Sequence, residues 1–361
     1  MNHARRPTYD GADSSGVMVT KMKIWFDADN GPHALIMKPL ADHLTEQGHI
    51  VRFTARDRTS TCQLLDLFDL EYTVVGHEYK PGMTGKIAGT LGRAWQLYRT
   101  MKSWGPDVSF GHSSRALPIA SWLMGVPTLT MYDYEWINST LFNLFCTRIL
   151  LPKVIGSARV DEAGIKGNKV EFYNGLKEEL YVAGRKLAPK DLNELGLKPD
   201  KIKILLRPPA TTAHYHNPES EQLLARLLEL LLPRKDVQIV VIPRTPDQLE
   251  LFPADQGAEI IVPQRVFDGP GMIAACDMVI SGGGTMVREA AVLGVPAYSY
   301  FRGKTGNVDH WLEEEGRLVL LTSPAEVDEK LQVVQKNPKD QYPLNQDLVP
   351  EITQQIVESA G

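Results

Sequence analysis

The sequence predicts an α/β protein built from two doubly wound, Rossmann-like domains, each with a parallel sheet. Short apolar runs alternate with amphipathic segments from residue 23 to about residue 321, which is the pattern of strands and helices in turn. Glycine or proline stands near most of the junctions, where helices end and turns begin. Strands joined through helices pair in parallel and are covered on both faces. A chain of 361 residues is long enough for two such domains.

The first domain is expected to span residues 22–178. Its predicted strands are 23–29, 49–56, 72–76, 106–112, 127–133 and 147–152. Its predicted helices are 34–48, 59–70, 84–104, 115–125 and 136–145. Residues 1–21 are polar and lack the apolar core of a signal peptide, so we expect a disordered leader there.

The second domain is expected to span residues 179–335, with residues 156–200 as the connection between the two. Its predicted strands are 203–208, 237–244, 258–263, 277–281, 296–300 and 317–321. Its predicted helices are 218–233, 268–276, 285–293 and 307–315. Residues 324–360 are polar and predicted to be helical, and 336–361 form a C-terminal helical tail.

The composition excludes several classes of protein. With 43% hydrophobic and 23% charged residues the chain is an ordinary globular protein, and a net charge of −5 argues against a surface devoted to nucleic acid. The three cysteines are far apart and form no CxxC pair, which indicates neither a zinc site nor a disulfide framework. No stretch is apolar for long enough to span a membrane. A reduced cytoplasmic setting is therefore predicted.

Candidate site residues in the first domain follow the predicted strands, because ligands of an open parallel sheet bind beyond the carboxyl ends of its strands. They are Asp29, His33, His112, Asp133 and Glu135. Asp133 and Glu135 could be a general acid–base pair if burial raises one pKa, or a helix-capping Asp beside an exposed Glu. The Asp27-Ala-Asp29 pair could suggest a metal, but its place at a strand end favours a base or hydroxyl ligand at Asp29. We predict no metal and no cofactor.

In the second domain the sequence VISGGGTMVREAAVLGVP (279–296) places three glycines between a strand and a helix. The N–H groups and the positive dipole end of such a helix can hold a phosphate, and glycine lets the anion come close. We predict a phosphate site at Ser281, Gly282, Gly283, Gly284 and Thr285, with Glu289 placed to hold a ribose. A tight turn followed by an ordinary N-terminal glutamate is the alternative. Arg207 and His214 follow the first strand of this domain, and His214 could contact substrate.

The segment DMVISGGGTMVREAAVLGVPAYSYF resembles the nucleotide-sugar segment of GT-B glycosyltransferases and of non-hydrolysing UDP-N-acetylglucosamine 2-epimerases. FDADNGPHALIMKPLADHL is similar to their first loop and long helix. FTARD, PDVSFGH, YDYE, YNGLKE and RPPATTAHYH are similar to a prokaryotic family, domain of unknown function 354, over most of residues 22–335.

The resemblance implies a GT-B-like fold whose two domains face each other across a cleft. It implies that Ser281 to Thr285 and Arg207 hold a diphosphate, and that Glu289 holds the ribose. His33 and the Asp133–Glu135 pair would face the sugar.

The activity expected from the resemblance is transfer of a sugar from a nucleotide sugar, with a UDP-sugar as the expected donor. The acceptor could be lipid-linked, and the expected pathway makes a cell-envelope polysaccharide. A nucleotide-sugar 2-epimerase and a non-catalytic nucleotide-sugar binder are the alternatives. The basic, aromatic helix within residues 85–104 could lie on the inner face of a membrane, or it could simply cover the sheet.

Overall fold

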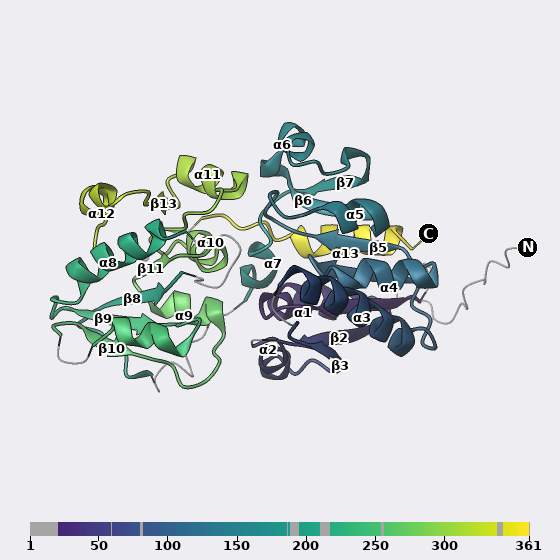
Figure 1. Cartoon of the computed structure of the whole chain (residues 1–361), viewed down its shortest axis with the longest axis horizontal. Helices are drawn as coiled ribbons and strands as arrows, with labels where there is room; N and C mark the ends of the chain where they lie inside the picture. The colour runs from purple at the N-terminus through teal and green to yellow at the C-terminus, as the bar shows by residue number, and fades with distance from the viewer. Residues whose placement is uncertain are drawn as a thin grey trace, which may run out of the picture. The chain divides into compact units, whose positions relative to one another are not determined.

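The computed structural model describes residues 21–58, 60–79, 82–185, 187, 195–209, 217–253, 256–337 and 342–360. The chain divides into two compact units (Figure 1). Unit 1 is Met1–Tyr181 together with Asn345–Gly361, and unit 2 is Val182–Leu344. The predicted leader at 1–21 lies almost wholly outside the described residues. The predicted cleft between the domains stays a prediction.

Unit 1 holds a seven-stranded parallel sheet in the order β3-β2-β1-β4-β5-β6-β7. The strands are β1 Lys23–Ala28, β2 Ile50–Asp57, β3 Tyr72–His77, β4 Val108–His112, β5 Thr128–Met131, β6 Arg148–Pro152 and β7 Val170–Tyr173. At its centre Phe26 is in register with Phe53 on β2 and with Phe110 on β4, and the three rings pack together. The strand order reverses between β1 and β4. Ligands of such a sheet are expected beyond the carboxyl ends of these two strands.

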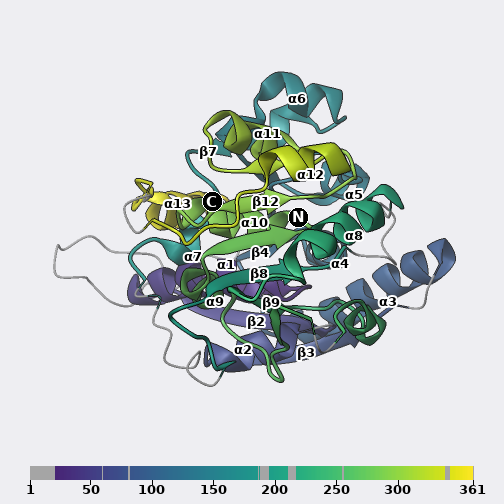
Figure 2. The same cartoon turned by 90° about the vertical axis from the view of Figure 1, so that its left-hand side faces the viewer.

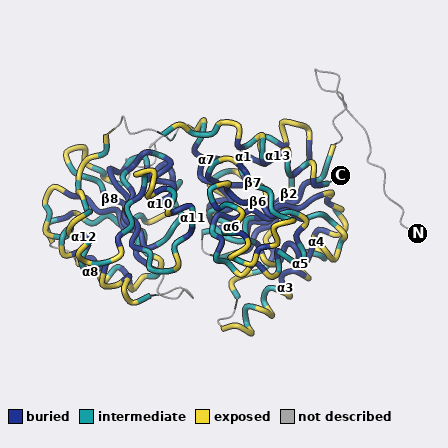
Figure 3. The backbone as a smooth tube through the Cα atoms, turned by 90° about the horizontal axis from the view of Figure 1, so that it is seen from above, coloured by how far each residue is buried: buried dark blue, intermediate teal, exposed yellow. Residues whose placement is uncertain are grey.

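The helices of unit 1 bury one apolar face each. They are α1 Pro32–Glu46, α2 Thr61–Leu67, α3 Met83–Met101, α4 Ala116–Met124, α5 Thr140–Phe145, α6 Ser157–Glu162, α7 Glu179–Val182, which crosses the boundary with unit 2, and α13 Leu348–Glu358. α3 and α4 pack together over Trp25, with Leu97 and Leu117 buried between them. Figure 3 shows the strands of this sheet as buried and much of the outer helices as exposed.

Two expectations for unit 1 are wrong. Residues 156–200 are not a plain connection, because they contain α6, β7 and α7. β7 is an edge strand of four residues in which only Tyr173 is fully buried, so its apolar alternation is too weak to predict a strand.

The second correction concerns the tail. α13 is not a separate tail but part of unit 1, where it packs beside α1. Its residues Leu348, Ile352 and Ile356 are spaced four apart and wholly buried, as an amphipathic helix that completes a core requires. Residues 331–337 are not helical, so the expected helix over 324–360 is interrupted.

Unit 2 holds a six-stranded parallel sheet in the order β10-β9-β8-β11-β12-β13. The strands are β8 Ile202–Arg207, β9 Val237–Val241, β10 Glu259–Ile261, β11 Met278–Ser281, β12 Ala297–Ser299 and β13 Val319–Leu320 (Figure 2 labels β8, β9 and β12). The helices are α8 Glu219–Leu231, α9 Gly269–Ala275, α10 Gly284–Val292, α11 Asn307–Glu314 and α12 Pro324–Lys330. The leucine-rich face of α8 packs on β8 and β9 in one core. The order reverses between β8 and β11, where the glycine-rich turn stands.

Across the described ranges, no helix combines the length and the apolar character that a membrane crossing requires.

Candidate functional site

Unit 1 carries a buried cluster of charged and polar side chains at the carboxyl end of β1. The carboxylate of Asp27 accepts two hydrogen bonds from the Arg93 guanidinium, at 2.7 and 2.9 Å. It also accepts from the hydroxyls of Ser114 and Thr54, each at 2.6 Å. Arg93 comes from α3 and is 2% exposed. Since protein donors occupy both oxygens of Asp27, this side chain positions its neighbours.

Asp29 is the carboxylate of this cluster that solvent reaches. Its Oδ1 lies 3.3 Å from Arg56 Nη1 and 3.4 Å from Arg93 Nη1, yet this oxygen makes no hydrogen bond with the described part of the chain. The side chain keeps 18% of its surface exposed. Burial raises the pKa of Asp29, and the two arginines only partly oppose that shift. A carboxyl group with a raised pKa is suited to proton transfer.

His33 and His112 form the next part of the cluster, with ring centroids 5.0 Å apart. The backbone N–H of Asp29 donates to Nδ1 of His33 at 3.0 Å. Burial, followed by the nearby charge of His112, lowers the pKa of His33 well below its ordinary value. His33 is therefore neutral at physiological pH and carries its proton on Nε2. In this tautomer it is a hydrogen-bond donor, not a base.

Asp133, after β5, is held by a lysine that the sequence analysis did not select. Lys177 Nζ lies 2.9 Å from Asp133 Oδ2 and also contacts the Glu178 carboxylate. His112 Nε2 lies 3.8 Å from Asp133 Oδ1. Lys177 and Glu178 follow β7 and are buried. The YNGLKE motif could have pointed to these two residues, because Lys177 and Glu178 follow an apolar run that forms β7.

Glu135 is fully buried, and its Oε1 lies 3.8 Å from Nε of Arg159 on α6. The Arg159 guanidinium also lies over the Trp136 ring, 5.1 Å from its centroid. The alternative of a capping Asp beside an exposed Glu is wrong, since both Asp133 and Glu135 are buried. His33, His112 and Asp133 are thus brought together, whereas Glu135 lies beside Arg159.

In unit 2 one of the three glycines, Gly282, is required by close packing against backbone. A Cβ on Gly282 would lie 2.8 Å from Pro209 Cα, and a Cβ on Gly283 would lie 2.5 Å from Arg244 Nη2. Gly284 has no such neighbour, since its nearest is the Arg288 guanidinium at 3.6 Å. Packing requires the first glycine, whereas the second lies only against the movable end of the Arg244 side chain, and the third begins α10 with its N-terminus uncrowded.

Polar groups surround the start of α10. The buried Ser281 hydroxyl accepts from the Gly283 N–H at 3.1 Å. Arg207 Nη1 lies 3.3 Å from Met286 Sδ, and Arg244 Nε donates to the Pro208 carbonyl at 3.1 Å. α10 therefore begins beside two guanidinium groups as well as with its own N–H groups, a combination that suits an anion.

Glu289 lies one turn into α10 and is 3% exposed. Its Oε2 lies 3.7 Å from the position that a Cβ on Gly269 would take. The neighbouring Arg288 is a structural residue, because it makes a two-pronged ion pair with Asp309 at 2.6 and 3.0 Å. His214 lies outside the described residues, so its expected contact with substrate stays a prediction.

The sequence matches the model of one protein family, described as a protein of unknown function (DUF354), over residues 22–360. The chain belongs to the DUF354 family. The resemblance drawn from its motifs is confirmed. An uncharacterized relative of this DUF354 chain is MJ0665 of Methanocaldococcus jannaschii, which is 25% identical over 309 residues, covering 82% of this chain and 87% of the relative.

Solved structures share the fold of this DUF354 chain. The UDP-GlcNAc 2-epimerase of Neisseria meningitidis bound to UDP-GlcNAc has a TM-score of 0.69 at 15% identity, over 93% of this chain and 100% of the epimerase. HepE of Anabaena in complex with UDP-glucose has a TM-score of 0.60 at 18% identity, over 94% of this chain and 99% of HepE. The predicted GT-B-like architecture, two parallel-sheet α/β domains, is confirmed.

Proposed function

We propose that this protein is a glycosyltransferase that takes a sugar from a nucleotide sugar, with a UDP-sugar as the donor. The observation that carries the proposal is the set of groups that could bind an anion at the start of α10. There Gly284 leaves the helix N-terminus uncrowded, and Arg207 and Arg244 lie nearby. The UDP-sugars in the epimerase and HepE structures support this choice of donor.

Unit 2 would hold the donor. The N–H groups of Gly284 and Thr285 would receive the diphosphate, and the two arginines would offset its charge as the sugar leaves. Glu289, buried one turn further on, would accept hydrogen bonds from the ribose hydroxyls. His214 and Ser281 complete the residues proposed to contact the donor.

Unit 1 would supply the proton transfer. Asp29 is the proposed base, because its pKa is raised and its side chain is partly exposed. It would take the proton of the acceptor hydroxyl as the glycosidic bond forms. His33 would donate from Nε2 to an oxygen of the sugar or acceptor, and His112 would line the same position. Asp133, fixed by Lys177, would orient the sugar, with Glu135 supporting that loop.

The first test is thermal unfolding of the wild-type chain with UDP, GDP, CMP, dTDP and ADP and their common sugars. A ligand that binds only the folded state raises the melting temperature. We expect a shift selective for uridine nucleotides that Glu289→Ala loses. Asp29→Asn should keep the shift while losing turnover with an acceptor. The absence of a shift with every nucleotide would refute the proposal.

A nucleotide-sugar 2-epimerase is the second candidate, favoured by two separate proton-handling groups in unit 1. One is Asp29 with His33, and the other is Asp133 with Lys177 and Glu178. Epimerisation through loss and return of a C–H proton needs such groups. Incorporation of solvent deuterium into the recovered sugar would establish epimerisation, and its absence together with a glycosylated acceptor would establish transfer.

A further inference from the structure

α3 has an apolar stripe on its solvent face in addition to the face that it buries. Ile87, Leu91 and Trp95 are spaced four apart and are 54%, 55% and 54% exposed. A neighbouring face of the helix already supplies the core contacts, through Ala94, Leu97 and Met101. Burial in unit 1 therefore does not account for the exposed stripe, which an ordinary surface helix would replace with polar residues.

The charge along the same segment has one sign. Residues 79–106 contain no Asp or Glu, although the chain as a whole has a net charge of −5. Arg99 and Lys102 follow the stripe at the end of the helix and are exposed. Cations at a helix C-terminus are favoured by the helix dipole, but the dipole gives no reason for three exposed apolar side chains next to them.

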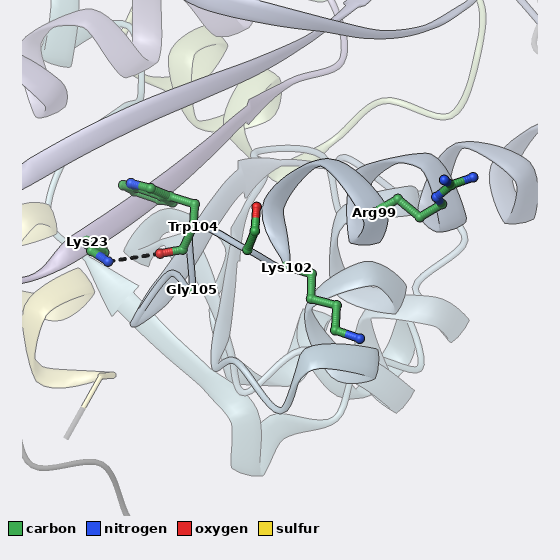
Figure 4. Close-up of a pocket in the computed structure, with 6 residues that line it drawn as sticks. Lys23, Arg99, Lys102, Trp104 and Gly105 are labelled. Carbon is green, nitrogen blue, oxygen red and sulfur yellow. Dashed lines mark hydrogen bonds between the residues drawn. The ribbon is translucent and has the colours of Figure 1, made fainter.

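A basic pocket stands at this end of α3. It has a volume of 420 Å³ and is lined by Lys23, Arg99, Lys102, Ser103, Trp104 and Gly105 (Figure 4). Lys23 Nζ donates to the Trp104 carbonyl at 2.9 Å, and the Arg52 guanidinium lies over the Trp104 ring at 4.9 Å. Asp107 is the acidic neighbour, and its carboxylate accepts from the Lys23 backbone N–H at 2.7 Å.

The pocket lies at the amino end of the unit 1 sheet. Lys23 begins β1, and Gly105 precedes β4. The candidate catalytic cluster lies at the carboxyl end of the same strands. A ligand in the basic pocket would therefore not occupy the position proposed for the sugar.

We propose that the outer face of α3 docks on an anionic phospholipid bilayer. Ile87, Leu91 and Trp95 would enter the interface between headgroups and acyl chains, where tryptophan is favoured. Lys23, Arg99 and Lys102 would contact lipid phosphates. The stacked Trp95 and Tyr98 rings, with centroids 5.1 Å apart, give the helix an aromatic surface at that depth. This inference does not depend on the reaction that the protein catalyses.

The test is flotation of the full chain with vesicles of phosphatidylcholine alone or mixed with phosphatidylglycerol. We expect binding to the anionic vesicles that falls as salt rises. Arg99→Gln with Lys102→Gln should weaken that binding roughly thirtyfold, at about 1 kcal/mol for each basic residue near the surface. Lys235→Gln with Leu251→Ser is the matched control in unit 2, since both residues are exposed. That control should bind like the wild type.

The stripe is tested separately with Ile87→Ser, Leu91→Ser and Trp95→Ser combined. Brominated lipids should quench the tryptophan fluorescence of the wild type, and Trp95→Phe should reduce that quenching while leaving flotation nearly unchanged. The triple variant should bind anionic vesicles more weakly than the wild type at the same melting temperature. Equal binding to neutral and anionic vesicles, or no binding, would overturn the proposal. A wild-type dimer that the triple variant converts to a monomer, without vesicle binding, would assign the stripe to self-association instead.

Discussion

The guanidinium of Arg93 on α3 donates a hydrogen bond to each carboxylate oxygen of Asp27, at 2.7 and 2.9 Å. Both side chains are almost completely buried. The pair ties the helix to the end of β1, next to Asp29. Arg93 Nε also donates to the Val75 carbonyl at 2.9 Å, so one guanidinium joins α3 to β1 and β3.

Replacing Arg93 with Ala should destabilise the protein strongly. The change leaves the Asp27 carboxylate buried without its cation, and breaking a buried pair from one side costs about 3–5 kcal/mol. Urea unfolding would measure the loss. Lys38→Gln removes an exposed ion pair with Asp42 and should leave the transition unchanged. A small change in the free energy of unfolding for Arg93→Ala would mean that water or a structural rearrangement compensates the charge of Asp27.

Lys177→Met should remove activity and lower stability. Lys177 is the cation between Asp133 and Glu178, so its loss leaves two buried carboxylates facing each other. We expect a fall in kcat with acceptor while the UDP-induced thermal shift survives, because the diphosphate site that we propose is in unit 2. If kcat is retained in a folded variant, Lys177 has only a structural role.

His33 should make the protein acid-sensitive. Its pKa is lowered in the folded chain, so the unfolded chain binds more protons below about pH 6.5, and stability present above that pH is lost as the pH falls. The loss follows a slope of up to about 1.4 kcal/mol per pH unit for one proton.

His33→Gln should flatten this slope between pH 7.5 and 5.5, and its amide oxygen can still accept from Asp29. Burial also lowers the pKa of His49, so part of the slope should remain. An unaltered slope in His33→Gln would show that His33 is already charged in the folded chain or does not titrate.

Gly282→Ala and Gly284→Ala should separate the two explanations of the glycine-rich turn. The first places a methyl group 2.8 Å from Pro209 Cα. Because that atom belongs to the backbone and cannot move away easily, the clash should cost about 1–3 kcal/mol of stability. The second meets only the Arg288 side chain at 3.6 Å and should leave stability equal or slightly higher. If α10 receives a diphosphate, Gly284→Ala weakens UDP binding without unfolding the chain. Unchanged UDP affinity would favour the tight-turn explanation.

The sequence predicted the fold well where strands are buried on both faces, because runs such as VQIVV and KILLR have one interpretation in an alternating chain. β7 was missed because an edge strand has little apolar alternation. The strand-end rule selected Asp29, His33, His112 and Asp133, which the structure places in one cluster. It could not select Arg93, which reaches the cluster from the middle of a helix, or Lys177, which follows the missed strand.

The return of α13 to unit 1 constrains how the protein is made. The chain leaves unit 1 at Tyr181, builds unit 2 and comes back at Asn345. Leu348, Ile352 and Ile356 are wholly buried there, so the first unit cannot close its core on the ribosome before residues 345–361 have been synthesised. Unit 2, by contrast, is continuous in the chain. A stop codon placed after unit 2 would therefore leave unit 1 without α13 and with an incomplete core.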